Sequence, residues 1–186
     1  CLTAWRAPTD NDRKIKYNWG LYEDNLSGIN LNRLFSKVYS CEYNDNEIVV
    51  RGNLAGISRI PFLYHTITYK FFENGMHVTL DGNINEKINC PFLPRLGFEF
   101  VLNKTNDSFT YFGMGDMENY CDMCCHAKMG EYTSTAREEY VNYIMPQEHG
   151  NHTKTKKLSM GCGIEFIGDS EFEFNVSEYT SETLSN

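Results

Sequence analysis

The amino-acid sequence predicts an all-β protein, an antiparallel β-sandwich built from many short strands. Apolar and polar residues alternate with a period of two, turn residues separate the alternating segments, and the two candidate helices are short. A period of two is typical of half-buried strands, whereas an amphipathic helix needs apolar residues every three or four positions. With 41% hydrophobic residues in 186, we expect one sandwich domain over residues 1–186.

The first half of the chain predicts two weak helices and a clear hairpin. Residues 17–25 and 30–37 are weakly helical because Asn and Gly interrupt them. From 66 to 81 the alternation is regular on both sides of Asn74-Gly75, a turn that joins two strands into a hairpin. We expect His65 to lie on the polar, solvated face of the first of these strands.

Five further segments with the same alternation predict strands: residues 47–51, 98–102, 109–112, 163–167 and 172–176. Residues 116–140 and 143–157 show no sustained period and are predicted to be loops, which carry sites more often than core. Gly113-x-Gly115 lacks the third glycine and the following helix of a nucleotide-binding loop, and is predicted to be a turn.

Charge and composition exclude several classes of protein. With 25 acidic against 17 basic side chains the net charge is −8, the wrong sign for a nucleic-acid partner. No apolar run is long enough to span a membrane. Seven cysteines without a repeating spacing predict reduced thiols and a cytoplasmic location.

Cys121-x-x-Cys124-Cys125-His126 is half of a zinc motif. Thiolates and an imidazole at this spacing can share a tetrahedral ion, but no second close pair completes the set. We therefore expect incidental cysteines on a loop and no metal site in this chain.

Several sequence blocks carry a resemblance to a known family. In chain order they are Trp5 to Asp12 (WRAPTDND), Leu93 to Gly97 (LPRLG), Phe112 to Gly115 with Glu118 to Tyr120, Tyr143 to Glu148 with Gly150-Asn151, and Phe172 to Tyr179. Together they resemble the C-terminal β-sandwich domain (small chain, or domain 5) of β-galactosidases of glycoside hydrolase family two. The resemblance covers essentially the whole chain and implies a galactose mutarotase-like supersandwich, truncated here at its C-terminal end.

The resemblance also implies a role for the chain. In such enzymes, which are retaining glycosidases that hydrolyse β-D-galactosides such as lactose, both catalytic carboxyl groups lie on a preceding barrel domain. Such a barrel needs about 250 residues, more than this chain has. We therefore expect no catalytic residue here, no activity of the chain alone, and no cofactor, with Mg²⁺ and Na⁺ of the parent enzyme on other domains. The expected partners are the barrel of the same polypeptide, the galactoside, and further copies of the parent enzyme.

The candidate residues for contacting the sugar or the neighbouring domain lie in the matching blocks: Asp10, Asn11, Asp12, Glu118, Asn119, Gln147 and Glu148. Short carboxylates and amides suit sugar hydroxyls because they bond directionally without ordering a long side chain. The alternative is structural: Asp10 and Asn11 cap a turn, and the others are satisfied inside the fold. Trp5 and Trp19 are candidate stacking platforms, although core packing is the stronger prediction for Trp5.

Departures from the family pattern leave the sugar specificity open. Lys14 stands where a glycine usually follows the opening block, and other departures occur at Asp116, Cys121, Met123, His152 and Leu158.

Two other functions remain open. A stand-alone mutarotase-like enzyme needs a His acid and a Glu base that converge on one sugar, and His65, His126, His149, Glu118 and Glu148 are available. A carbohydrate-binding module needs exposed aromatic side chains on one sheet face, which sequence alone does not locate.

Overall fold

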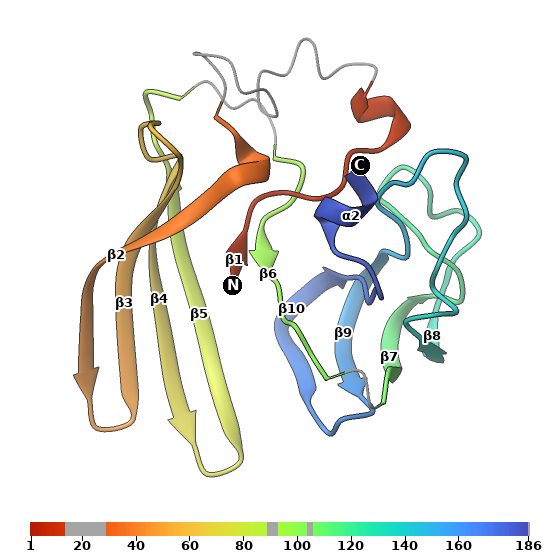
Figure 1. Ribbon diagram of the computed structural model, residues 1–186. Helices are drawn as coiled ribbons and strands as arrows, with labels where there is room; N and C mark the ends of the chain where they lie inside the picture. The colour runs from red at the N-terminus through yellow and green to blue at the C-terminus, as the bar shows by residue number, and fades with distance from the viewer. Residues whose placement is uncertain (14–28, 89–92, 104–105, 186) are drawn as a thin grey trace. The chain divides into compact units, whose positions relative to one another are not determined.

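The computed structural model describes residues 1–13, 29–88, 93–103 and 106–185, whose strands form three antiparallel sheets (Figure 1). The strands are β1 (Leu2–Thr3), β2 (Leu34–Asn44), β3 (Glu47–Gly56), β4 (Leu63–Phe72), β5 (Gly75–Ile84), β6 (Gly97–Phe98), β7 (Ser108–Gly115), β8 (Lys128–Thr135), β9 (His152–Met160) and β10 (Glu165–Phe174). A 3-10 helix, η1 (Leu31–Arg33), and a short helix, α2 (Ser181–Ser185), accompany them. The predicted class, an all-β antiparallel sandwich, is confirmed by these strands.

Contacts divide the chain into two compact units. Unit 1 contains Cys1–Arg6 and Asn11–Glu99, and unit 2 contains Ala7–Asp10 and Phe100–Asn186. Each unit has its own four-stranded sheet and its own hydrophobic cluster. That the two units together form one domain stays a prediction.

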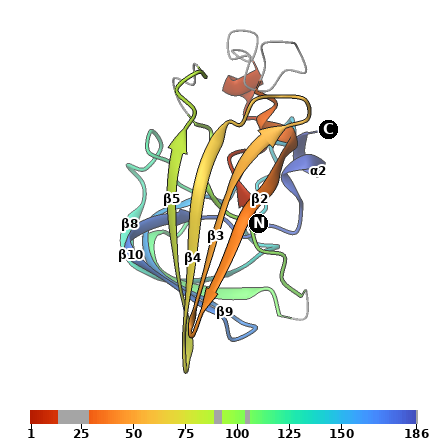
Figure 2. The same ribbon diagram turned by 90° about the vertical axis from the view of Figure 1, so that its left-hand side faces the viewer.

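The sheet of unit 1 is a meander in the order β2-β3-β4-β5, with every neighbouring pair antiparallel (Figure 2). The predicted hairpin is confirmed, since Phe72 of β4 pairs with Gly75 of β5 across the turn. Beside this sheet β1 pairs with β6. The buried hydrophobic cluster of unit 1 consists of Ala4, Ile29, Leu31, Leu54, Phe62 and Leu63. Burying a side chain such as Phe62 contributes about 1.5–3 kcal/mol.

The sheet of unit 2 has the order β10-β9-β7-β8. β9 follows β8 in the sequence but pairs with β7 and β10. Phe109, Tyr111, Leu158 and Met160 form its buried cluster. Phe174 meets Phe109 edge to face, with ring centroids 5.7 Å apart. Such aromatic contacts add about 0.5–1.5 kcal/mol beyond the buried area.

The predicted helix over 30–37 is wrong, because only Leu31–Arg33 is helical and β2 begins at Leu34. β2 pairs with β3 from Leu34 to Asn44, and this cross-strand pairing outweighs the weak local helix propensity. The other predicted helix, 17–25, lies outside the described residues.

The later strands also differ from the prediction. In place of the strand predicted over residues 98–102, the structure has the two-residue strand β6, Gly97–Phe98. Phe100 lies beyond this strand and packs on Phe166, with ring centroids 5.1 Å apart. The two predicted strands near the C-terminus are one strand, β10, with register shifts after Ile167 and after Phe172. The predicted loop 116–140 contains β8, and the predicted loop 143–157 contains the first part of β9.

The prediction for His65 is wrong, because its side chain is 5% exposed and shares a face with Leu63 and Ile67. Residues two apart lie on the same face of a strand. Its partners across the sheet are Gly52 and Gly82, which have no side chain to fill the space. A Cβ on Gly52 would lie 3.1 Å from Cε1 of His65, so the glycine leaves room for the ring. Burial lowers the pKa of His65.

Gly113 and Gly115 lie inside β7 and not in the predicted turn. A Cβ on Gly113 would lie 2.6 Å from Oγ1 and 3.0 Å from Cα of Thr155. Gly113→Ala is therefore expected to lower the free energy of unfolding by about 1–3 kcal/mol through overpacking. Urea denaturation measures this effect.

The matched control for that substitution is Gly97→Ala in β6, where an added Cβ meets nothing within 4 Å. Its stability should stay within about 0.5 kcal/mol of the unchanged protein. Equal stability of the two variants would contradict the predicted clash.

Within the described residues, no helix combines the length and the apolar character that crossing a membrane requires.

Candidate functional site

Most of the candidate residues lie in unit 2, where they cross-link the loops around β7 and β9. Glu118 is the centre of this network. Its carboxylate accepts hydrogen bonds from the backbone N–H of Gly150 at 2.9 Å, from the hydroxyl of Tyr120 at 3.2 Å, and from the hydroxyl of Tyr143. The three donors hold the loop after β7 against the loop before β9.

Asn119 is fully buried and uses both ends of its side-chain amide. Its Nδ2 donates to the carbonyl oxygens of Met114 at 3.0 Å and Met117 at 3.1 Å. Its Oδ1 accepts from the backbone N–H and the hydroxyl of Thr153, at 3.0 and 2.6 Å. Because each polar atom of its side chain is satisfied internally, Asn119 orders the main chain of the loops around it.

Gln147 and Glu148 are also buried. The Oε1 of Gln147 accepts from the backbone N–H of Asp10 at 3.0 Å. Residues 10–13 are helical, so this N–H lies at a helix start, where backbone donors lack helical partners. Glu148 accepts from Nδ2 of Asn175 at 3.0 Å. The network thus ties the opening block of the sequence to a loop more than 130 residues later.

The opening block is divided between the units. Asp10 belongs to unit 2, whereas Asn11 and Asp12 belong to unit 1. Asp12 is buried and pairs with Arg6 at 2.6 Å, and Arg6 also donates to the carbonyl of Pro94 at 3.2 Å. Asn11 is exposed. Of the seven candidate residues, five therefore lie in unit 2 and two in unit 1.

A buried chain of three side chains was missed by the sequence analysis. The hydroxyl of Tyr111 lies 2.9 Å from Nδ1 of His152, whose Nε2 lies 2.9 Å from a carboxylate oxygen of Glu139. The side chain of His152 is fully buried and that of Glu139 nearly so. Burial, followed by the negative charge of Glu139, raises the pKa of Tyr111. Of these three residues, the sequence analysis singled out only His152, as a departure from the family pattern.

His126, His149 and the cysteines have ordinary surroundings. His126 contacts the carbonyl oxygen of Glu118 at 3.0 Å through Nε2, and His149 contacts that of Gln147 at 2.9 Å through Nδ1. The six described cysteines are free thiols. Within the described residues no three His, Cys, Asp or Glu side chains are grouped as metal ligands. Trp5 packs against the buried cluster of unit 1, and Trp19 lies outside the described residues.

Tyr143 makes part of this network sensitive to alkaline pH. Burial and the hydrogen bond to Glu118 raise the pKa of Tyr143 to about 12, while an unfolded tyrosine titrates near 10. Between these values the unfolded chain loses a proton that the folded chain keeps, so folding stability is complete below about pH 10 and falls as the pH rises towards 12. In Tyr143→Phe this decline should be shallower, as urea denaturation at stepped pH would show.

Tyr43→Phe is the control, because Tyr43 is 74% exposed on β2. Its pH dependence should match that of the unchanged protein. An unchanged slope in Tyr143→Phe would contradict the role assigned to Tyr143.

Chemically, the network is a set of internal cross-links. The described bonds of Glu118, Asn119, Gln147 and Glu148 all run to other groups of the same unit. They give the loops after β7 and before β9 one fixed geometry, which is what a surface that supports a neighbouring site requires.

Comparison with known proteins agrees with the family resemblance that the sequence blocks carry. The sequence profile of the family described as "Beta galactosidase small chain" matches residues 1–186. The chain is 32% identical to a β-galactosidase of Actinobacillus pleuropneumoniae over 98% of its own length, and 33% identical to one of Kluyveromyces lactis over 95%. A β-galactosidase of Staphylococcus xylosus is 30% identical over 97% of the chain. In each case the chain spans 18% of the relative's length. The chain therefore belongs to the β-galactosidase small-chain family.

Proposed function

We propose that this chain is the non-catalytic C-terminal sandwich region of a β-galactosidase, a retaining glycosidase that hydrolyses terminal β-D-galactosides such as lactose. The family match over residues 1–186, combined with the 18% share of the relatives' length, is the observation that carries the proposal. In this role the chain packs on the catalytic barrel of the same polypeptide and helps to shape the sugar site.

The carboxylates of the network support a structural role. A retaining glycosidase needs two carboxyl groups roughly 5 Å apart, one of them free to attack the sugar. Glu118 is held by three donors, and Glu139 is buried against His152. Neither carboxylate is placed to act as a nucleophile on a bound sugar, so we propose that the chain alone does not hydrolyse glycosides.

The mutarotase alternative finds little support. It needs an accessible His and Glu that face one sugar. His65 is buried in unit 1, and His126 and His149 contact backbone carbonyl oxygens. The described His–carboxylate pair, His152 with Glu139, has a fully buried imidazole that a sugar does not reach.

Hydrolysis of a chromogenic β-galactoside tests the proposal. Three samples are compared: the intact polypeptide that contains this chain, the same polypeptide without it, and residues 1–186 alone. We expect turnover by the intact polypeptide, a large loss without the chain, and none by the chain alone. Turnover by residues 1–186 alone would contradict the non-catalytic role, and full activity without them would contradict the supporting role.

Gln147 tests whether the network shapes the sugar site. Gln147→Ala removes the acceptor of the Asp10 N–H and so weakens one link between the opening block and the loop before β9. We expect Gln147→Ala to lower kcat/KM of the intact enzyme about tenfold, which corresponds to a loss of about 1.4 kcal/mol of positioning energy. Asn142→Ala, at an exposed position nearby, is the control. Equal kcat/KM in both variants would show that the loop does not position the sugar site.

The remaining expectations stay predictions. They are Mg²⁺ and Na⁺ on other domains of the parent enzyme, its assembly into a homo-oligomer, and its cytoplasmic location.

A further inference from the structure

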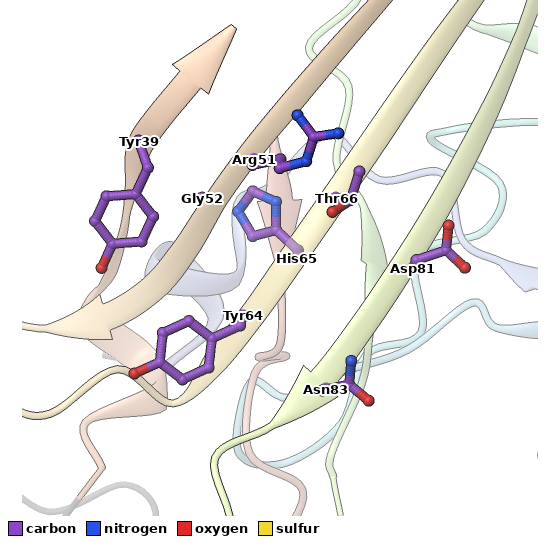
Figure 3. A pocket seen from close by; sticks show the side chains of 8 residues that line it. All are labelled: Tyr39, Arg51, Gly52, Tyr64, His65, Thr66, Asp81 and Asn83. Carbon is purple, nitrogen blue, oxygen red and sulfur yellow. The ribbon is translucent and has the colours of Figure 1, made fainter.

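The sheet of unit 1 carries a hollow of about 260 Å³ that the network in unit 2 does not involve (Figure 3). Most of its lining consists of polar and aromatic side chains from all four strands: Tyr39, Arg51, Tyr64, Thr66, Asp81 and Asn83. No family block of the sequence contains these residues.

Strand register places these side chains on one face of the sheet. Thr66 pairs with Arg51 on one side and with Asp81 on the other. Tyr64, two residues before Thr66 in β4, pairs with Asn83. Directly paired residues share a face, as do residues two apart along a strand. These residues therefore lie on the opposite face from the buried Leu63 and Ile67. The lining is completed by Gly52 and by His65, which shares the buried face.

A register irregularity brings a second tyrosine to the face that carries Tyr64. Tyr39 is the extra residue between Val38 and Ser40 in β2. Its hydroxyl is hydrogen bonded to Nδ2 of Asn53, which pairs with Tyr64. Asn53 is buried, and its Oδ1 has no partner among the described residues. Two tyrosine rings, 56% and 44% exposed, thus border the same hollow.

The polar groups of the hollow have unused hydrogen-bonding capacity. Within the described part of the chain, the side chains of Tyr64, Thr66, Asp81 and Asn83 have no hydrogen bond or ion pair. Tyr64 and Thr66 stand on β4, which is paired with β3 and β5, and Asp81 and Asn83 stand on β5, which is paired along its length with β4. A ligand would therefore meet donors and acceptors that the sheet holds in place.

Charge indicates which kind of ligand fits. Arg51 is already paired with Glu42, and Asp81 places a carboxylate on the same face. An anion such as phosphate would meet the repulsion of Asp81. A cation beside the hollow, Lys37, lies over the ring of Tyr39, with its Nζ 5.5 Å from the ring centroid. A neutral molecule with many hydroxyls and an apolar ring face matches both the amide, hydroxyl and carboxylate groups and the tyrosine rings.

We propose that this hollow binds a neutral saccharide, with a sugar ring stacked on Tyr64 and its hydroxyls bonded to Asp81 and Asn83. The volume is slightly below the roughly 300–1,000 Å³ of drug-sized ligand pockets, which suits a single sugar ring. The proposal does not rest on the catalytic role of the parent polypeptide.

Saturation-transfer NMR on the intact polypeptide tests this site with four probes: methyl β-D-galactopyranoside, methyl β-D-glucopyranoside, sorbitol and inorganic phosphate. Sorbitol has the hydroxyls but no ring face. The variants are Tyr64→Ala and Asp81→Asn, which change exposed side chains. Their controls are Tyr43→Ala, on the opposite face of the same sheet, and Asp122→Asn, in an exposed loop of unit 2.

We expect at least one glycoside to bind, with an affinity about tenfold lower in Tyr64→Ala and Asp81→Asn than in the two controls. Comparing variants removes the contribution of any other sugar site in the polypeptide. Glycoside signals that are equal in all four variants would overturn the proposal. It would also be overturned if sorbitol or phosphate showed the same dependence on Tyr64 and Asp81.

Discussion

Glu139→Ala is expected to lower the free energy of unfolding by about 3 kcal/mol, because removing one partner of a buried hydrogen-bonded pair leaves the other unsatisfied. Nε2 of the fully buried His152 would lose its acceptor at 2.9 Å, and the link to Tyr111 would lose its anchor. For a chain of this length each kcal/mol shifts Tm by about 2–4 °C. A thermal melt should therefore show a decrease of about 6 °C or more.

Glu138→Ala is the matched control for this substitution. Glu138 is exposed and bonds locally to Thr135, so its loss should change stability by about 0.5 kcal/mol or less. Tyr111→Phe keeps the packed ring but removes the hydroxyl that contacts His152. Combined with Glu139→Ala it should destabilise by less than the sum of the single changes, because both act through one imidazole. Additive effects would show that the three side chains are independent.

Asn119→Asp should destabilise unit 2 by about 3 kcal/mol or more, although the two side chains have the same shape. The amide nitrogen of Asn119 donates to the carbonyl oxygens of Met114 and Met117. A carboxylate at this fully buried position would place an oxygen against both carbonyls and bring a charge into the core. Urea denaturation followed by circular dichroism measures the loss.

Asn142→Asp provides the comparison for Asn119→Asp, because Asn142 is exposed in a loop of the same unit. The same chemical change should alter its stability by about 0.5 kcal/mol or less. If both Asp variants were equally stable, the hydrogen bonds of Asn119 would not be holding the loop.

The sequence predicted the parts of the fold where periodicity and turn chemistry agree. The β4–β5 hairpin is an example, because Asn74-Gly75 marks the turn and apolar residues alternate on both sides. β9 was missed because its buried positions hold His152, Thr153 and Thr155, which periodicity counts as polar. His152 and Thr153 are buried beside hydrogen-bonding partners from a distant strand and distant loops, and Thr155 is buried against Gly113 of β7. Such neighbours are not visible in a local sequence window.

The sequence named the candidate residues but left open whether they contact a ligand or are satisfied inside the fold. Glu118, Asn119, Gln147 and Glu148 were identified from their sequence blocks, and the structure gives each of them hydrogen-bond partners within unit 2. Whether they also contact a sugar or a neighbouring domain stays a prediction. The burial of Glu139 could not be predicted from the sequence, because Glu139 stands in a charged run, Arg137 to Glu139, that is typical of a solvated surface.

The path of the backbone has a consequence for biosynthesis. Ala7–Asp10 belong to unit 2, although Asn11–Glu99 return to unit 1 before the remainder of unit 2 begins at Phe100. On the ribosome these four residues emerge before the rest of unit 2, and the Gln147 side chain that receives the Asp10 N–H is synthesised more than 130 residues later. Unit 2 therefore cannot mature by itself as a nascent segment, and severing the polypeptide after Glu99 would separate it from its own beginning.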